Sequence, residues 1–115
     1  MLAQAMEALT GTGGKFMQWF GGGKMEMVPA VANRFLEMMA ETTIGWLLLE
    51  AAVIAEAAAS RLAPDHPDRA FYEGKRFAAQ YFAYNVLPNV AAKAQLIARE
   101  DRSALDIPAG AFAPA

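Results

Sequence analysis

The chain has 115 residues, a formal net charge of −2 and a hydrophobic content of 56%. This length suits one domain, and a small helical domain cannot bury so many apolar side chains by itself, so we expect some to contact a partner. Mild acidity and scattered Lys and Arg residues argue against a nucleic-acid-binding protein. The lack of cysteine excludes disulfides and thiolate metal sites and fits a reducing cytoplasm.

The first 28 residues are expected to form a short helix followed by a glycine-rich connector. Leu2, Met6 and Leu9 recur at helical spacing. The glycines that follow are expected to end this helix and then to break the chain again, and they are Gly11, Gly13, Gly14 and the run at 21–23. Glu7 and the lack of a positively charged segment make a poor signal peptide, so we predict a cytoplasmic location.

A second helix of about 30 residues is expected between Pro29 and Leu62, where strong helix formers dominate. Pro29 suits the first helical turn, because an N–H group at that position has no partner within the helix. Gly45 is the only helix breaker inside this segment, and its place beside Trp46 indicates a close helix crossing. Gly74 is expected to serve the same purpose on the next helix.

One face of this second helix carries Arg34, Glu37 and Glu41, which we expect to form a solvated stripe of paired charges. A wide apolar arc occupies the rest of the circumference and predicts contacts on more than one side. The most apolar run, residues 44–55, is shorter than the roughly 20 residues that cross a bilayer, and it contains Glu50. We therefore expect no membrane span.

A turn rich in Pro and Asp should end this helix and start a third one. Asp65 or Asp68 is expected to cap the new helix, and His66 to help start it. The connection is short, so the second and third helices should be antiparallel neighbours. The third helix is expected to end at about Ala98 and to be kinked at Pro88, which removes one hydrogen bond and crowds the preceding turn.

The third helix has two apolar faces, which predict two packing partners. One face carries Phe71, Phe82, Val86, Val90 and Ile97, and the other carries Phe77, Tyr81 and Tyr84. Residues 103–115 contain two prolines and a glycine and are expected to form an extended tail that docks through Leu105, Ile107 and Phe112.

The sequence contains no complete motif for binding phosphate or a metal ion. Gly23 and Lys24 are followed by Met25, where a phosphate-binding loop requires Ser or Thr, so this segment is predicted to be a flexible linker. His66 is the only histidine and stands between two prolines, without a second histidine to share a metal ion. We predict no catalytic, cofactor-binding or metal-binding residue in this chain.

Glu50 is the one residue that raises a question, because it lies among Leu and Ala residues, and a buried carboxylate is costly unless it is paired. We expect a structural ion pair with Arg76 or Lys75, or a place at the rim. A lone carboxylate is weak evidence for catalysis. The aromatic side chains could line a cofactor slot, but at helical spacing they more often form a core or an interface: Trp19, Phe35, Trp46, Phe71, Tyr72, Phe77, Tyr81, Phe82 and Tyr84.

Three segments then stand out together: GWLLLEAAVIAEAA at 45–58, FYEGKRFAAQYFAYNVLP at 71–88 and SALDIPAGAF at 103–112. In this order and spacing they resemble the C-terminal helical domain of bacterial FAD-dependent acyl-CoA dehydrogenases, in particular the methylmercaptopropionyl-CoA dehydrogenase type. The resemblance covers roughly residues 31–112. It implies that FAD, acyl-CoA and the catalytic glutamate belong to a larger region that this sequence lacks, and that no catalytic residue carries over to it.

We therefore expect an all-α chain with a short helix and glycine-rich connector at 1–28, a helical hairpin at 29–102 and an extended tail at 103–115. An antiparallel hairpin of two long helices would complete its bundle by self-association. The expected function is that of a non-catalytic accessory module, which packs against a dehydrogenase body or joins subunits. The alternatives are an amphipathic helical protein that coats a lipid or polymer surface, and a small acyl-chain-binding bundle in which Met38, Met39 and the aromatic residues line a slot.

Overall fold

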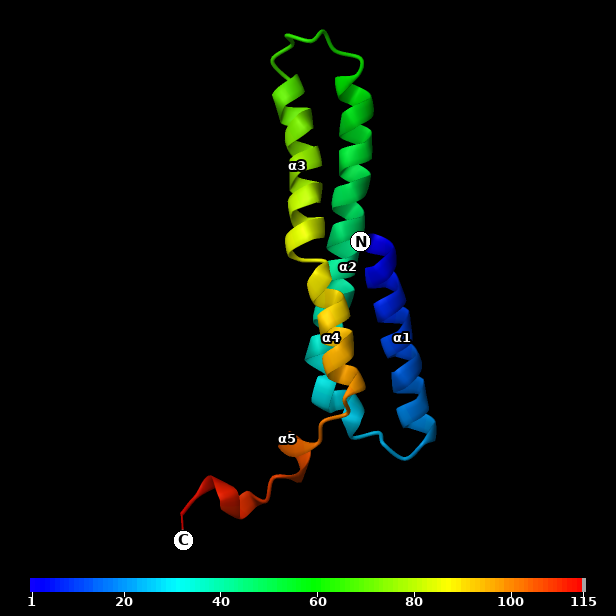
Figure 1. Ribbon diagram of the computed structural model, residues 1–115, viewed down its shortest axis with the longest axis vertical. Helices are drawn as coiled ribbons and strands as arrows, with labels where there is room; N and C mark the ends of the chain where they lie inside the picture. The colour runs from blue at the N-terminus through cyan, green and yellow to red at the C-terminus, as the bar shows by residue number, and fades with distance from the viewer. Residues whose placement is uncertain (115) are drawn as a thin grey trace.

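The computed structural model describes residues 1–114, and this part of the chain is helical with no β-strand (Figure 1). Its elements are α1 (Leu2–Gly21), α2 (Met27–Ala59), α3 (Arg69–Asn85), α4 (Pro88–Ala98), α5 (Ser103–Asp106) and the 3-10 helix η1 (Ala109–Phe112). Helix α2 runs the length of the bundle, α3 and α4 return along it in the opposite direction, and α1 lies beside its first half (Figure 1). The all-α class and the antiparallel hairpin are confirmed.

Helix α1 is longer than expected, because it continues through Gly11, Gly13 and Gly14 to Gly21. Each glycine costs about 1 kcal/mol in a helix interior relative to Ala. Packing opposes this cost, because α1 buries Ala5 and Trp19 against α2 and α4. The expectation that the first glycines end the helix was therefore wrong. The reversal occurs only after Gly21, where the connector includes a glycine with a positive φ.

The turn between α2 and α3 is held by local hydrogen bonds. Arg69 donates from Nη1 to the carbonyl oxygen of Ala59, the last residue of α2, at 2.8 Å and to that of Leu62 in the turn at 3.1 Å. His66 accepts the backbone N–H of Asp68 through Nδ1 at 3.1 Å, so the expected role of His66 at the start of the helix is confirmed. Asp68 occupies the cap position, but its side chain forms no capping hydrogen bond, which corrects the expected aspartate cap.

The expected third helix is divided into α3 and α4 at Val86 and Leu87. Pro88 stands at the first position of α4, where its missing N–H costs nothing, so the chain breaks in front of the proline. Leu87 is buried against Gly45, and a Cβ atom added at Gly45 would lie 2.8 Å from Leu87 Cδ2. The close crossing at Gly45 is confirmed. Gly74 has no neighbour within 4 Å of such a Cβ atom, so that expectation was wrong.

The core lies in the half of the molecule where α1, α2 and α4 meet. Its buried side chains are Ala5, Trp19, Met27, Met38, Leu87, Val90 and Ile97. The other half contains only α3 and the second half of α2, and α3 has no buried residue. We call this two-helix part, residues 45–84, the upper hairpin. The molecule is accordingly long and thin, with principal extents of 73 × 36 × 15 Å.

The tail does not dock on the bundle. Leu105, Ile107 and Phe112 remain 41%, 45% and 76% exposed, and the segment leads away from the helices (Figure 1). It also forms two short helical segments, α5 and η1, where an extended conformation was expected. The residues that were expected to dock the tail are therefore not part of the core within residues 1–114, which corrects the prediction.

Candidate functional site

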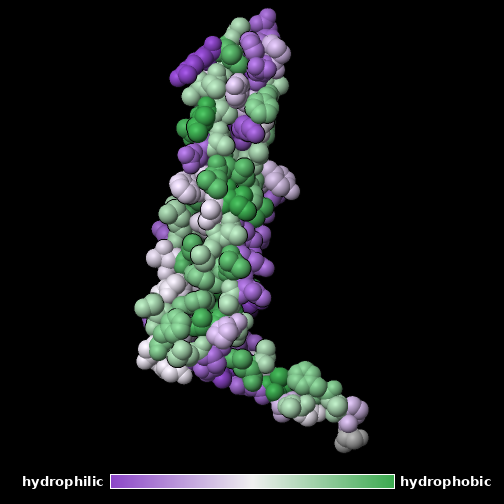
Figure 2. Space-filling model, turned by 180° about the vertical axis from the view of Figure 1, so that it is seen from behind, coloured by the Kyte–Doolittle hydropathy of each residue, from purple (hydrophilic) through white to green (hydrophobic). Residues whose placement is uncertain are grey.

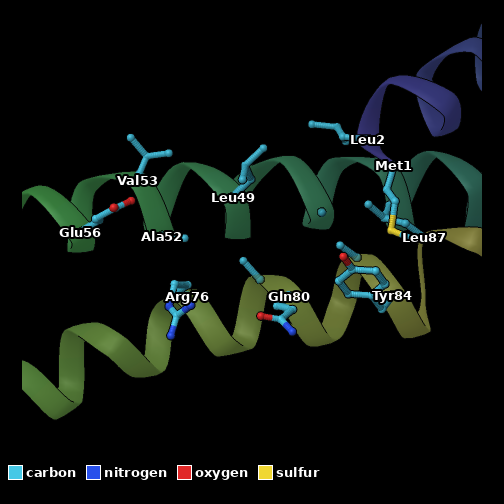
Figure 3. A pocket seen from close by; sticks show the side chains of 13 residues that line it. Met1, Leu2, Leu49, Ala52, Val53, Glu56, Arg76, Gln80, Tyr84 and Leu87 are labelled. Carbon is cyan, nitrogen blue, oxygen red and sulfur yellow. The ribbon is translucent and has the colours of Figure 1, made fainter.

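A groove runs between the two helices of the upper hairpin (Figure 3). Helix α2 contributes Gly45, Leu49, Ala52, Val53 and Glu56, helix α3 contributes Arg76, Ala79, Gln80, Ala83 and Tyr84, and Leu87 with Met1 and Leu2 closes one end. Its volume is about 490 Å³. Most of the lining is apolar, with Gln80 between the two ends; one end carries Glu56 and Arg76, and the other carries Tyr84 (Figure 3).

A second apolar surface lies on the side of α2 that faces away from α3. We call it the outer face of α2. Its exposed side chains recur at helical spacing and are Leu36, Met39, Trp46, Leu47 and Ile54, each between 44% and 63% exposed. Figure 2 shows hydrophobic side chains over much of the molecule when it is seen from behind. Exposed apolar surface of this extent is typical of a protein–protein interface.

Glu50 stands within this outer face. Its side chain is exposed. Of the two expected positions for Glu50, a buried ion pair or the rim of an apolar surface, it occupies the rim. Within residues 1–114 it forms no ion pair with Arg76 or Lys75, which corrects the other expectation. Arg76 contacts Glu73 at 3.4 Å, and the Lys75 ammonium lies 4.8 Å from the centre of the Phe71 ring.

The expected charged stripe on α2 is organised by a residue that the sequence reasoning did not identify. Lys93 of α4 binds Glu41 at 2.5 Å and Glu37 at 3.1 Å, so these carboxylates join two helices. Burial by itself lowers the pKa of Lys93, but its hydrogen bonds to Glu41 and Glu37 outweigh this effect and raise the pKa above its usual value. Arg34 remains exposed and is not part of this cluster. The sequence feature that could have indicated such a cation is the spacing of Glu37 and Glu41, which places two carboxylates one helical turn apart on the same face.

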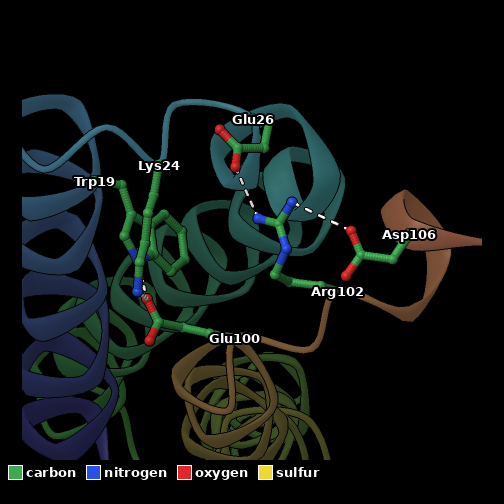
Figure 4. A network of polar contacts seen from close by, with 6 residues as sticks. All are labelled: Trp19, Lys24, Glu26, Glu100, Arg102 and Asp106. Carbon is green, nitrogen blue, oxygen red and sulfur yellow. Dashed lines mark hydrogen bonds and ion pairs between the residues drawn. The ribbon is translucent and has the colours of Figure 1, made fainter.

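A second polar cluster fastens the end of α4 to α1 (Figure 4). The Trp19 indole N–H donates to the Glu100 carboxylate, and the Nζ atoms of Lys15 and Lys24 lie 4.0 and 3.7 Å from it. The hydrogen bond from Trp19 and the two nearby cations lower the pKa of Glu100. Glu100 adopts a φ of +51°, an uncommon conformation for a residue with a side chain, as α4 ends.

The start of the tail is held by a separate charged pair. Arg102 contacts Glu26 at 2.7 Å and Asp106 at 3.3 Å (Figure 4). A backbone hydrogen bond, followed by the hydrogen bond from Arg102, lowers the pKa of Glu26. These groups are exposed and join the start of the tail to the residue that precedes α2. They do not form a concave site.

The structure assigns the remaining candidate residues to structural positions. Lys24, next to the connector glycines, contacts Glu100. Residues 1–114 contain no group of three or more His, Asp or Glu side chains placed to hold a metal ion. Met38 is completely buried and Met39 is 44% exposed, so the two do not line a common acyl slot.

The aromatic residues divide between the core and the surface. Trp19 is buried, and Phe16 packs on it with ring centres 5.3 Å apart and on Phe35 with centres 4.6 Å apart. The face with Phe82, Val90 and Ile97 packs on the core as expected. The face with Phe77, Tyr81 and Tyr84 is between 54% and 67% exposed, and so is Phe71 at 63%, so these rings form no enclosed slot.

Helix α2 also passes, by length and composition alone, the test for a helix that can cross a membrane. Helices inside soluble bundles pass the same test. Its contacts with α1, α3 and α4 and its carboxylates bound to Lys93 are those of a bundle helix.

An elongated helical bundle with an open groove and an exposed apolar face has the features of an accessory domain that completes its packing on another protein. The sequence model of the family described as "Acetyl-CoA dehydrogenase C-terminal like" matches residues 1–108. The chain belongs to this family of acyl-CoA dehydrogenase C-terminal domains.

Similar proteins include a "Butyryl-CoA dehydrogenase" of Syntrophomonas wolfei, 33% identical over 87 residues, which are 76% of this chain and 14% of the relative. A "Broad-specificity linear acyl-CoA dehydrogenase FadE5" of Mycobacterium tuberculosis is 37% identical over 79 residues, which are 69% of this chain and 13% of the relative. The matched part is thus a small fraction of each relative. No solved structure matches the chain.

Proposed function

We propose that this chain is a non-catalytic accessory module that packs against the FAD-binding body of an acyl-CoA dehydrogenase, within the methylmercaptopropionyl-CoA dehydrogenase type and in the cytoplasm. The observation that carries the proposal is the outer face of α2, which exposes Trp46, Leu47 and Ile54 beside one another. Large apolar and aromatic side chains of this kind anchor protein interfaces. Flavin and acyl-CoA would be bound by the body.

Glu50 gives this interface a chemical requirement. Its carboxylate stands among the apolar side chains of the outer face, so docking would remove it from water. The surface that receives it must therefore supply a cation or an N–H donor opposite Glu50. An exposed carboxylate among apolar side chains is suitable for an interface that combines apolar contacts with one fixed ion pair.

The test is co-purification with a dehydrogenase body encoded in frame with this chain or next to it. Ile54→Glu, on the outer face, should weaken binding to the body by about tenfold or more, because it places a charge in the desolvated centre of the interface. Val53→Glu is the matched control, because Val53 is equally exposed but lines the groove. The purified chain alone should be colourless. Flavin absorbance in the isolated chain, or equal binding by the two variants, would refute the proposal.

A further inference from the structure

The break between α4 and α5 is not explained by the local sequence. The chain contains neither Gly nor Pro between Pro88 and Pro108, and residues 94–100 are mostly strong helix formers. Residues 103–106 are helical again as α5, so only residues 99–102 separate the two helices. Helix propensity alone therefore favours one continuous helix over residues 88–106.

Glu100 makes the break. Its φ of +51° lies in the left-handed region, directly after Arg99, the C-terminal cap of α4. Helices often end with a left-handed residue, but that residue is usually Gly, because a Cβ atom makes the conformation unfavourable. The Glu100 N–H donates to the Ile97 carbonyl oxygen at 3.1 Å, and within residues 1–114 no backbone hydrogen bond joins α5 to α4. Contacts from elsewhere must therefore stabilise this conformation.

The contacts that hold Glu100 come from α1 and the connector (Figure 4). The Trp19 indole N–H donates to its carboxylate, and the Nζ atoms of Lys15 and Lys24 lie 4.0 and 3.7 Å from it. All three groups precede α2 in the sequence, and they meet Glu100 only because α1 packs beside α4. Tertiary packing and helix propensity thus favour different backbone conformations at the same residue.

Arg102 adds a second restraint on the far side of the break. It contacts Glu26, the residue before α2, at 2.7 Å, and this contact fixes the start of the tail to the base of the bundle. Its other contact, to Asp106 at 3.3 Å, joins residues four apart. That spacing also suits a continuous helix, so the Asp106 contact does not oppose the joining of α4 and α5.

We propose that residues 99–102 form a conformational switch that sets the direction of the tail. While α1 and the connector hold Glu100, α4 and α5 stay apart and the tail leads away from the bundle (Figure 1). When this contact is released, α4 and α5 join into one helix that carries the tail along the axis of α4. The joined helix gives the amides of 102–104 the carbonyl oxygens of 98–100 as acceptors. The switch is independent of the proposed docking to a dehydrogenase body.

Loss of the Glu100 charge is the chemical change that releases the switch. A neutral carboxyl no longer attracts Lys15 and Lys24, and it accepts a weaker hydrogen bond from Trp19. Arg99 and Asp101 are the charged groups beside it in the sequence. The hydrogen bond from Trp19 and the two lysines lower the pKa of Glu100, so the switch opens only at acidic pH. High salt acts in the same direction, because it screens the lysines.

Backbone chemical shifts of residues 99–103, measured by NMR on the 115-residue chain, test the proposal because they report helix formation at each residue. Glu100→Ala removes the contact and favours the helix, so these residues should become helical and the population of the joined helix should rise by about tenfold or more. Glu100→Gly is the matched control. It removes the same contact, but Gly tolerates the left-handed conformation and disfavours a helix, so the break should remain.

A milder variant leaves Glu100 in place. Lys24 is exposed, so Lys24→Gln should retain the fold and raise the population of the joined helix by about twofold. Lys75→Gln, on the exposed surface of α3, should leave it unchanged. The wild-type chain should gain helical shifts at 99–103 on acidification, whereas Glu100→Gln should show them at neutral pH without further change. Equal shifts in the Ala and Gly variants, or a wild-type break that persists in acid, would overturn the proposal.

Discussion

The contact between Gly45 and Leu87 gives the sharpest stability prediction, because two effects of known size oppose each other there. Gly45→Ala should gain about 1 kcal/mol from helix propensity. The added Cβ atom, however, would lie 2.8, 3.1 and 3.2 Å from Leu87 Cδ2, Cδ1 and Cγ. Leu87 is buried, so relief requires movement of a packed side chain, and overpacking of this kind costs about 1–3 kcal/mol. We expect a net destabilisation of about 1 kcal/mol.

A double-mutant cycle separates these two effects. Leu87→Ala alone should cost about 3 kcal/mol through lost burial and a cavity. In the Gly45→Ala background it should cost about 1 kcal/mol less, because the new methyl group occupies part of the vacated space. Gly74→Ala is the matched control: no atom lies within 4 Å of its added Cβ, so it should stabilise the chain by about 0.5–1 kcal/mol.

Urea unfolding followed by helical circular dichroism measures all four variants and the wild type. The protein concentration must be kept equal, since association with a second copy would shift apparent stability. Additivity of Gly45→Ala and Leu87→Ala would refute the close-contact argument. So would a stabilising Gly45→Ala that matches Gly74→Ala.

Two predictions concern the polar clusters. Lys93→Ala should destabilise the chain by about 1–3 kcal/mol in urea unfolding, because it leaves the largely buried Glu41 without its cation. Folding raises the pKa of Lys93. The stabilisation by Lys93 is therefore complete below its unfolded pKa and is lost only as the pH rises through the higher folded value. Folding lowers the pKa of Glu100, so its contribution is complete above the unfolded pKa and is lost as the pH falls through the folded value. In a Trp46→Phe background, the fluorescence of Trp19 should change with pH in that acidic range, because Glu100 accepts the indole N–H. Glu100→Gln should remove this change. If the change persists in the Gln variant, it does not come from Glu100.

Local sequence features predicted most of the helices. Strong helix formers between Pro29 and Leu62 and the Pro- and Asp-rich turn after them sufficed for α2 and the hairpin, because propensity and turn chemistry act over a few residues. Pro88 likewise marked the break between α3 and α4. The same local reasoning ended α1 too early at Gly11, since the packing of Trp19 on distant helices outweighs the cost of glycine.

The candidate surfaces were predictable only in outline. Composition indicated that apolar side chains would remain for a partner, and the two faces of the third helix indicated more than one contact. Which of them are buried depends on how the helices pack, because α1 and α4 cover one half of α2 and only α3 lies beside the other half (Figure 1). The partner of Glu37 and Glu41 was also undetermined, because Lys93 is distant in sequence and adjacent only after the hairpin closes.

By itself, the sequence determined the helical class, the hairpin and the membership of an acyl-CoA dehydrogenase domain family, because periodicity, breakers and motif order are properties of the chain. Only the tertiary structure decided which apolar residues are buried, where Glu50 lies and how the polar groups pair. The physical reason is that burial and ion pairing depend on distances between helices, and one helical periodicity is compatible with several arrangements of neighbours.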